Sequence, residues 1–334
     1  MPTLEQTMRQ VLALRREAGT ADAATAREAV GRHLEALGYR VEHQRFSFAP
    51  SSLNGFPVFG AGLGGLALLL LPPLTGAKFP PWVALLVLAG GLSLLVVASA
   101  GIGLGWLPLG GALRQDANLI ATRGEGPVRR WIVAHLDTKA QAQSMAGRLV
   151  AVWVIGVAAA ALTAAAVARL GGPVSVGLAG ACAGLAIVAG ALAGRGRLRG
   201  SSQGARDNGT GVAGALAAAE RSADAATGIL ITGAEEFGLV GARVFVAEAR
   251  ARLRHAVVVN LDTIDQEGTL ALVSHDGRGQ TLAEAEAPRL AAGGLTARLR
   301  RLPVGILTDS LPFARAGVPA VTIGRLTWRT LRTI

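Results

Sequence analysis

Cysteine, tyrosine and charge are all scarce in this 334-residue chain, which has one cysteine and one tyrosine. With Cys182 alone, the sequence excludes an intrachain disulfide and a cluster of metal-bound thiolates, and its apolar surroundings predict a small buried or lipid-facing residue. Asp, Glu, Lys and Arg make up 16% of the residues, whereas about 25% is usual in a soluble protein. This deficit argues against a wholly soluble protein and against a disordered one.

The missing charge is concentrated in four stretches, residues 46–77, 79–113, 149–168 and 170–194, which contain no Asp, Glu, Lys or Arg. A helix needs roughly 20 apolar residues to cross a bilayer. Buried core helices are the alternative, but four uncharged runs of this length favour a membrane. We therefore expect two transmembrane hairpins, with spans at Phe56–Thr75, Trp82–Leu107, Leu149–Ala168 and Val174–Ala193.

The net charge of +11 raises the question of a nucleic-acid partner. Aromatic residues for base stacking are only 4% of the chain, and Arg195, Arg197 and Arg199 cluster beside an apolar segment. The preference for positive charge on the cytoplasmic side of a membrane explains this cluster more simply. We expect a multi-pass membrane protein with the lipid bilayer and no nucleic acid as a partner, and its charged regions on the cytoplasmic side. Since no apolar core of a signal peptide precedes Arg40, no cleaved secretion peptide is expected.

The charged remainder alternates between short apolar runs and amphipathic segments, which indicates an α/β fold with a sheet covered by helices. The expected helices are 4–17, 22–37, 212–219, 239–250 and 280–292. The expected strands are Arg40–Phe48, Ala117–Thr122, Arg130–His135, Gly228–Thr232, Ala256–Leu261, Thr269–Val273 and Pro319–Ile323. One charged domain is thus predicted over 1–53, 113–147 and 195–334, interrupted by hairpins at 54–112 and 148–194.

Acidic residues and one histidine follow the ends of these strands, where α/β proteins bind their ligands. Each has an ordinary explanation by itself, as a helix cap, a solvated histidine or an exposed acid. Together they favour a cation, because adjacent carboxylates repel each other and an acid that ends an apolar strand is costly unless it is paired. The four clusters are His135-Leu136-Asp137, Asp207-Asn208-Gly209-Thr210-Gly211, Glu235-Glu236-Phe237-Gly238-Leu239 and Asn260-Leu261-Asp262.

In this order the clusters resemble the motifs of the co-catalytic di-zinc aminopeptidases, metallopeptidase family twenty-eight. Thr308-Asp309-Ser310-Leu311-Pro312-Phe313 and Gly317-Val318-Pro319-Ala320 extend the resemblance toward the end of the chain. It implies a zinc-exopeptidase-like mixed sheet flanked by helices, into which the two hairpins are inserted. His135 and Asp207 are farther apart in sequence than is usual in that family, and the hairpin at 148–194 accounts for the excess.

The resemblance implies two zinc ions bridged by Asp207, with His135 and Asp262 on one ion and Glu236 on the other. Two ions about 3.5–4 Å apart can polarise a peptide carbonyl and lower the pKa of a water. Glu235 would be the general base, and Asp137 would orient the ring of His135. The implied activity is a zinc-dependent aminopeptidase that cleaves N-terminal peptide bonds.

Two departures from the family pattern concern the end of the chain. Ser310 replaces a histidine that usually follows Asp309, and these two residues are predicted to contact substrate. The family's last metal-binding histidine is expected at or just beyond Ile334, so we expect that the chain is truncated or that the second zinc site lacks a ligand. His275, which follows an expected strand, is an alternative ligand.

Two further functions stay open. One is a non-catalytic membrane scaffold on a peptidase fold, and the other is an acyltransferase similar to glutaminyl cyclases, a mono-zinc branch of the same fold. The preferred side chain of the peptide and the oligomeric state are not specified by these residues.

Overall fold

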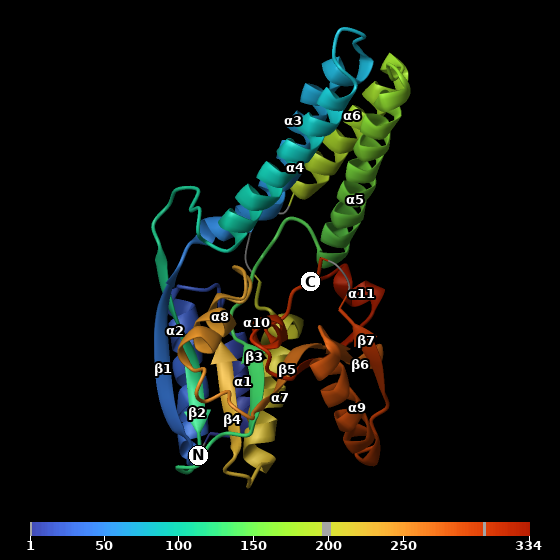
Figure 1. Cartoon of the computed structure of the whole chain (residues 1–334). Coiled ribbons are helices and arrows are strands. Elements are labelled where there is room, and N and C mark those ends of the chain that lie inside the picture. The colour runs from blue at the N-terminus through green and yellow to red at the C-terminus, as the bar shows by residue number, and fades with distance from the viewer. Residues whose placement is uncertain (1, 196–201, 303–304) are drawn as a thin grey trace. The chain divides into compact units, whose positions relative to one another are not determined.

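The computed structural model describes residues 2–195, 202–302 and 305–334, so Arg197 and Arg199 lie outside the described residues (Figure 1). Packing divides the chain into two compact units. The first, the sheet unit, comprises Met1–Phe48, Leu113–Ala140 and Gly200–Ile334, and the second, the helical unit, comprises Ala49–Ala112 and Gln141–Arg199. Each unit is described by itself.

The sheet unit is built on an eight-stranded mixed sheet in the order β1-β2-β4-β3-β5-β8-β6-β7. The strands are β1 (Arg40–Phe48), β2 (Arg114–Thr122), β3 (Arg130–His135), β4 (Thr227–Thr232), β5 (Val257–Ile264), β6 (Thr269–Ser274), β7 (Ala297–Arg301) and β8 (Ala320–Leu326). The four central strands β4, β3, β5 and β8 are parallel, so their carboxyl ends meet at one edge of the sheet.

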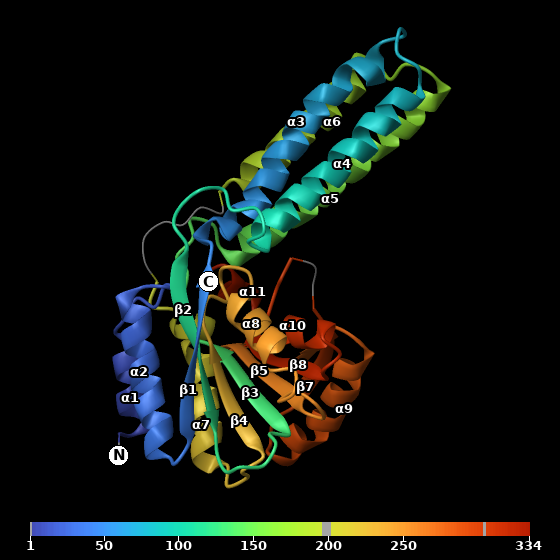
Figure 2. The same ribbon diagram turned by 60° about the vertical axis from the view of Figure 1, so that its left-hand side comes forward.

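Helices cover both faces of this sheet, as an α/β fold requires (Figure 2). One face packs against α1 (Leu4–Leu12), α2 (Ala21–Ala36), α7 (Thr210–Arg221) and α9 (Gly277–Ala292). The other packs against α8 (Val240–Glu248) and α10 (Ser310–Arg315). On this second face, the ring of Trp131 in β3 meets Phe245 in α8 edge-on at 5.1 Å, and Phe245 lies 6.1 Å from Phe313 in α10.

Three local expectations differ from the structure. The expected helix 4–17 ends at Leu12, and the following residues form a turn that directs Arg16 into the interior. The edge strand β7 was not predicted, because its sequence Ala-Arg-Leu-Arg-Arg has the charge of a loop, and arginines on an exposed edge are common. The short helices α10 and α11 (Trp328–Leu331) were also missed, since neither has enough residues for a helical period.

The helical unit contains four helices that are long and apolar enough to cross a membrane, judged by length and composition. They are α3 (Gly55–Thr75), α4 (Trp82–Gly103), α5 (Met145–Ala168) and α6 (Val176–Ala193). Large apolar side chains remain exposed on them, including Leu69, Leu94, Trp153 and Val176 at 68–76%. An uncharged surface of this kind suits contact with lipid rather than water.

Small residues let α3 and α6 approach closely, as they do in packed membrane helices. A Cβ atom added to Gly190 would lie 2.7 Å from the carbonyl oxygen of Gly60. At the turns between helices, the buried Arg169 guanidinium donates to the carbonyl oxygens of Pro73 at 2.9 Å, Gly76 at 3.0 Å and Phe79 at 2.6 Å. This one side chain therefore links the turn of one hairpin to the turn of the other.

Replacing Gly190 by leucine should separate α3 from α6 and destabilise the helical unit, because overpacking costs about 1–3 kcal/mol. The expected result is a lower melting temperature of the detergent-purified protein. The control is Gly180→Leu in the same helix, where an added Cβ meets nothing within 4 Å. Equal melting temperatures for the two variants would contradict this packing.

Candidate metal centre

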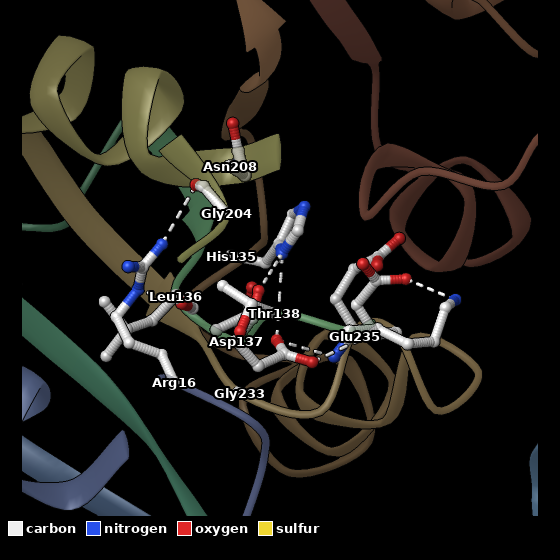
Figure 3. A network of polar contacts seen from close by, with 12 residues as sticks. Arg16, His135, Leu136, Asp137, Thr138, Gly204, Asn208, Gly233 and Glu235 are labelled. Atoms are coloured by element: carbon white, nitrogen blue, oxygen red, sulfur yellow. Dashed lines mark hydrogen bonds and ion pairs between the residues drawn. The ribbon is translucent and has the colours of Figure 1, made fainter. Parts of the chain in front are cut away.

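His135 ends β3 and is only 1% exposed, so its ring has a fixed place at the carboxyl edge of the sheet. Its Nδ1 lies 3.1 Å from the carbonyl oxygen of Asp137 (Figure 3). A carbonyl oxygen only accepts, so we assign the proton to Nδ1, which leaves Nε2 as the metal-binding nitrogen. Nε2 lies 3.1 Å from Oδ1 of Asp207 and 3.9 Å from Oδ1 of Asp262.

Asn208 connects the turn of Asp207 to the strand of Asp262. Its fully buried side-chain amide donates to the carbonyl oxygen of Leu261 at 2.8 Å. Its side-chain oxygen accepts from the backbone N–H of Gly211 at 3.1 Å and of Thr263 at 3.2 Å. Thus Asn208 holds the two carboxylates in register although they come from separate parts of the chain.

His135, Asp207 and Asp262 form a candidate metal site, because one ligand atom from each lies within 4.8 Å of the others. Zinc bonds of about 2.0–2.2 Å in tetrahedral geometry place ligand atoms about 3.3–3.5 Å apart, close to the separations seen here. Within the residues that the structure describes, His275 belongs to no such group, so the alternative ligand is not brought to this site.

Asp137 anchors the loop that carries the two glutamates. Its carboxylate accepts from the backbone N–H of Glu235 at 3.0 Å and of Glu236 at 3.1 Å, and lies 3.8 Å from Nδ1 of His135. The carbonyl oxygen of Asp137 is therefore the nearer partner of the ring. Glu235 is 8% exposed, whereas the carboxylate of Glu236 lies 2.5 Å from Nζ of Lys139.

Acidic groups are in excess at the carboxyl edge of the sheet, and the pKa values of several residues there are shifted. Burial raises the pKa of Asp137 to about 6, while His135 lowers it and Glu236 raises it. Burial also raises the pKa of Glu235 well above its ordinary value. For His135, burial lowers the pKa, but Glu235, Asp207 and Asp262 together outweigh burial and raise it. A divalent cation would relieve this repulsion.

Asp309 and Ser310 are fully buried behind the end of β4 and beside β8. Thr232 donates a hydrogen bond to one carboxylate oxygen of Asp309, and the other oxygen has no hydrogen-bond partner among the described residues. Burial raises the pKa of Asp309 to about 7. The hydroxyl of Ser310 lies 2.6 Å from that of Thr322 and 2.9 Å from Nε2 of His275.

Sequence reasoning missed Arg16, which is fully buried and binds backbone carbonyls from two distant segments (Figure 3). Its Nε donates to Leu136 at 2.9 Å, and its two terminal nitrogens donate to Gln203 at 2.7 Å and Gly204 at 3.1 Å. Arg16 thereby ties the loop after His135 to the turn before Asp207. In the sequence it lies in an expected amphipathic helix, where an arginine indicates a solvent-facing position.

A comparison with known protein families finds a match to part of this chain. Residues 187–331 match the family described as peptidase family M28. This part of the chain is similar to that family. The match includes Asp207, the Glu235–Glu236 pair and Asp262, whereas His135 precedes it. A family of metallopeptidases agrees with a candidate metal site at these residues.

Solved structures share the fold of this chain at low sequence identity. BSAP, a zinc aminopeptidase from Bacillus subtilis, matches with a TM-score of 0.55 and 13% identity over 99% of this chain and 86% of its own. A leucine aminopeptidase precursor from Bacteroides thetaiotaomicron matches at 0.53 and 14% over 100% and 90%. Fimbriiglobus ruber glutaminyl cyclase matches at 0.51 and 15% over 97% and 84%. No curated protein matches the sequence significantly.

The structure predicts that Arg16→Met weakens metal binding, because the loops on either side of the site lose their shared clamp. Hydrogen bonds from a charged donor contribute about 1.5–3 kcal/mol each, so the melting temperature should fall as well. Zinc affinity measured by competition with a chelator should decrease at least several-fold. The control is Arg15→Met, at an exposed neighbour. Unchanged zinc affinity in Arg16→Met would contradict the clamp.

Proposed function

We propose that this chain is a membrane-bound zinc aminopeptidase that hydrolyses the N-terminal peptide bond of its substrates. The single observation that carries the proposal is the convergence of His135, Asp207 and Asp262 at one edge of the sheet. The excess of buried carboxylates around them supports it, since a bound cation would stabilise their charged forms.

The donors fit zinc, because one neutral imidazole and two carboxylates are a usual ligand set for a catalytic zinc ion. When bound, the ion would polarise the peptide carbonyl and acidify a water. Glu235 does the proton transfer in this proposal: its carboxylate accepts a proton from the attacking water and returns it to the leaving amine. Burial raises the pKa of Glu235, so its carboxylate takes up a proton more readily than that of an exposed glutamate.

Asp137, Asp309 and Ser310 support this site in the proposal. Asp137 holds Glu235 by its backbone N–H, so the base keeps its position while the proton moves. Asp309 and Ser310 have no exposed surface in this structure. We therefore propose that they act from the interior, where their hydrogen bonds to Thr232 and Thr322 fix the position of the substrate side of the site.

Lys139 bears on the number of zinc ions. The second ion expected from the family resemblance would use Asp207 and Glu236, but the carboxylate of Glu236 is paired with the ammonium of Lys139. A cation is thus already beside Glu236, and a second zinc ion must displace it. We propose one tightly held zinc ion at His135, Asp207 and Asp262, and a weaker second position.

Membrane attachment rests on the four apolar helices and their exposed apolar side chains. An even number of spans puts all charged segments on one side of the bilayer. We propose the cytoplasmic side, because arginines follow the last helix. Lipid is then the second partner of the chain, beside the peptide substrate.

Glutaminyl cyclase-like acyl transfer is the second candidate, and the shared fold with a glutaminyl cyclase favours it. The two reactions differ in product. An aminopeptidase releases a free amino acid, whereas a cyclase converts an N-terminal glutamine into pyroglutamate and releases ammonia. Substrate assays therefore distinguish them directly.

The decisive experiment compares Glu235→Gln with His135→Ala in the full chain in detergent. We expect the wild type to bind zinc and to cleave aminoacyl reporter substrates, with loss of cleavage on chelation. Glu235→Gln should retain zinc and lose at least about 100-fold in kcat, since a general base contributes 10²–10⁴-fold. His135→Ala should lose zinc.

The control for both variants is Glu284→Gln, which changes an exposed glutamate in α9 and should leave both properties intact. Zinc binding with pyroglutamate as the product would replace the aminopeptidase by the cyclase. Absence of zinc and of both products in the wild type would favour a non-catalytic scaffold.

Lys139→Met tests the proposed metal count. The wild type should hold one zinc ion per chain after dialysis, and Lys139→Met should bind a second at least about tenfold more tightly than the wild type does, because Glu236 loses its ammonium partner. Native mass spectrometry counts the ions. Lys78→Met, at the chain's only other lysine, is the control. Two ions retained by the dialysed wild type would refute the single-ion arrangement.

A further inference from the structure

A second cavity opens at the opposite edge of the central sheet from the candidate metal centre. Its volume is about 690 Å³, and it is lined where β5 and β8 begin, by Val257 and Pro319 among others. Asp262 lies five residues farther along β5, which corresponds to roughly 17 Å of extended strand. The cavity is therefore separate from the site that the proposed function uses.

The ionisable side chains that line this cavity are all basic: Arg250, Arg254, His255 and Arg315. No acidic residue is among the residues that line it. Within the described ranges of the chain, the structure records no ion pair for Arg250, Arg254 or Arg315. Their positive charge is thus not neutralised by the protein.

Neighbouring groups add to this positive potential. Arg278 donates to the carbonyl oxygen of Gly317, which lines the cavity, at 3.1 Å. Burial lowers the pKa of the half-buried Arg243, and the proximity of Arg315 lowers it further. Like charges held this close repel each other, so a bound anion would stabilise the arrangement.

The backbone also holds one of the basic groups in an unusual conformation. His255 has φ of +65°, in the left-handed region that non-glycine residues seldom adopt. Such residues persist where the surrounding structure determines them, and they are enriched at ligand-binding positions. His255 lies two residues before β5 begins, between Arg254 and the buried Ala256.

The lining combines these cations with an apolar floor. Leu253 and Val318 are buried side chains of the lining, Pro319 follows Val318 in the chain, and these three residues are what we call the apolar floor. A guanidinium fork binds phosphate through two parallel hydrogen bonds, and several forks favour an anion with more than one charged oxygen. An apolar floor below a cationic rim fits a ligand that has a phosphate group and an apolar body.

We propose that this basic cavity is a binding site for a phosphate group, carried by an anionic lipid or by a soluble phosphate ester. Arg254 and Arg315 hold the phosphate oxygens, His255 adds a further donor, and the apolar floor takes the adjoining part of the ligand. The proposal does not depend on the proposed peptidase activity, since no residue of the metal centre lines the cavity.

The test uses the full chain in nanodiscs of phosphatidylcholine and the double variant Arg254→Met/Arg315→Met. Two probes are titrated separately: inorganic phosphate, and phosphatidylglycerol added to the nanodisc and counted by native mass spectrometry. The matched control is Arg298→Met/Arg300→Met, which removes the same charge from exposed positions on β7. Zinc content and reporter cleavage are measured on all three proteins and should be equal.

The wild type and the control should bind with the same affinity, and the cavity variant should bind at least tenfold more weakly. Binding of both probes identifies a lipid headgroup as the ligand, and binding of inorganic phosphate alone identifies a soluble ester. Equal losses in the cavity variant and the control would show a general effect of charge and overturn the proposal. It is also overturned if the wild type binds neither probe.

Discussion

The burial of several carboxylates close together is the constraint on which the candidate site depends. Asp137, Glu235 and Asp309 all have raised pKa values, and burial is the largest cause for each. A fold gains nothing by burying so many acids unless a cation compensates them. The adjacent ammonium of Lys139 neutralises the charge of Glu236. His135 and the two aspartates are close enough together to bind a metal ion, whose charge would compensate the remaining acids.

The rest of the sheet unit serves to hold these acids against their repulsion. Parallel pairing brings the carboxyl ends of four strands together, and backbone hydrogen bonds fix the loops that leave them. Arg16, Asn208 and Asp137 each link two such loops through main-chain groups. Because none of these bonds uses the carboxylate of Asp207 or of Asp262, those two groups stay available for a ligand.

The same sheet carries charge of the opposite sign where β5 and β8 begin. Acids gather at the carboxyl ends of the strands and arginines at the amino ends of these two, so a cation site and an anion site can share a scaffold without neutralising each other. The four apolar helices form a separate unit, in which glycines let helices pack closely and the buried Arg169 joins the turns. The candidate binding sites and the apolar surface therefore belong to different units of one chain.

The sequence by itself determined the elements whose signals are local: the long uncharged helices, the central strands, and the acidic clusters with His135 at strand ends. It could not determine contacts between distant residues. Arg16 looked like an exposed helical arginine and β7 like a charged loop, because burial and strand pairing depend on segments that are distant in the sequence. Only the tertiary structure decided that Arg16 turns inward to bind carbonyls and that Lys139 meets Glu236. Both contacts form because packing leaves backbone carbonyls and a carboxylate without other partners, and the sequence alone does not show which groups those are.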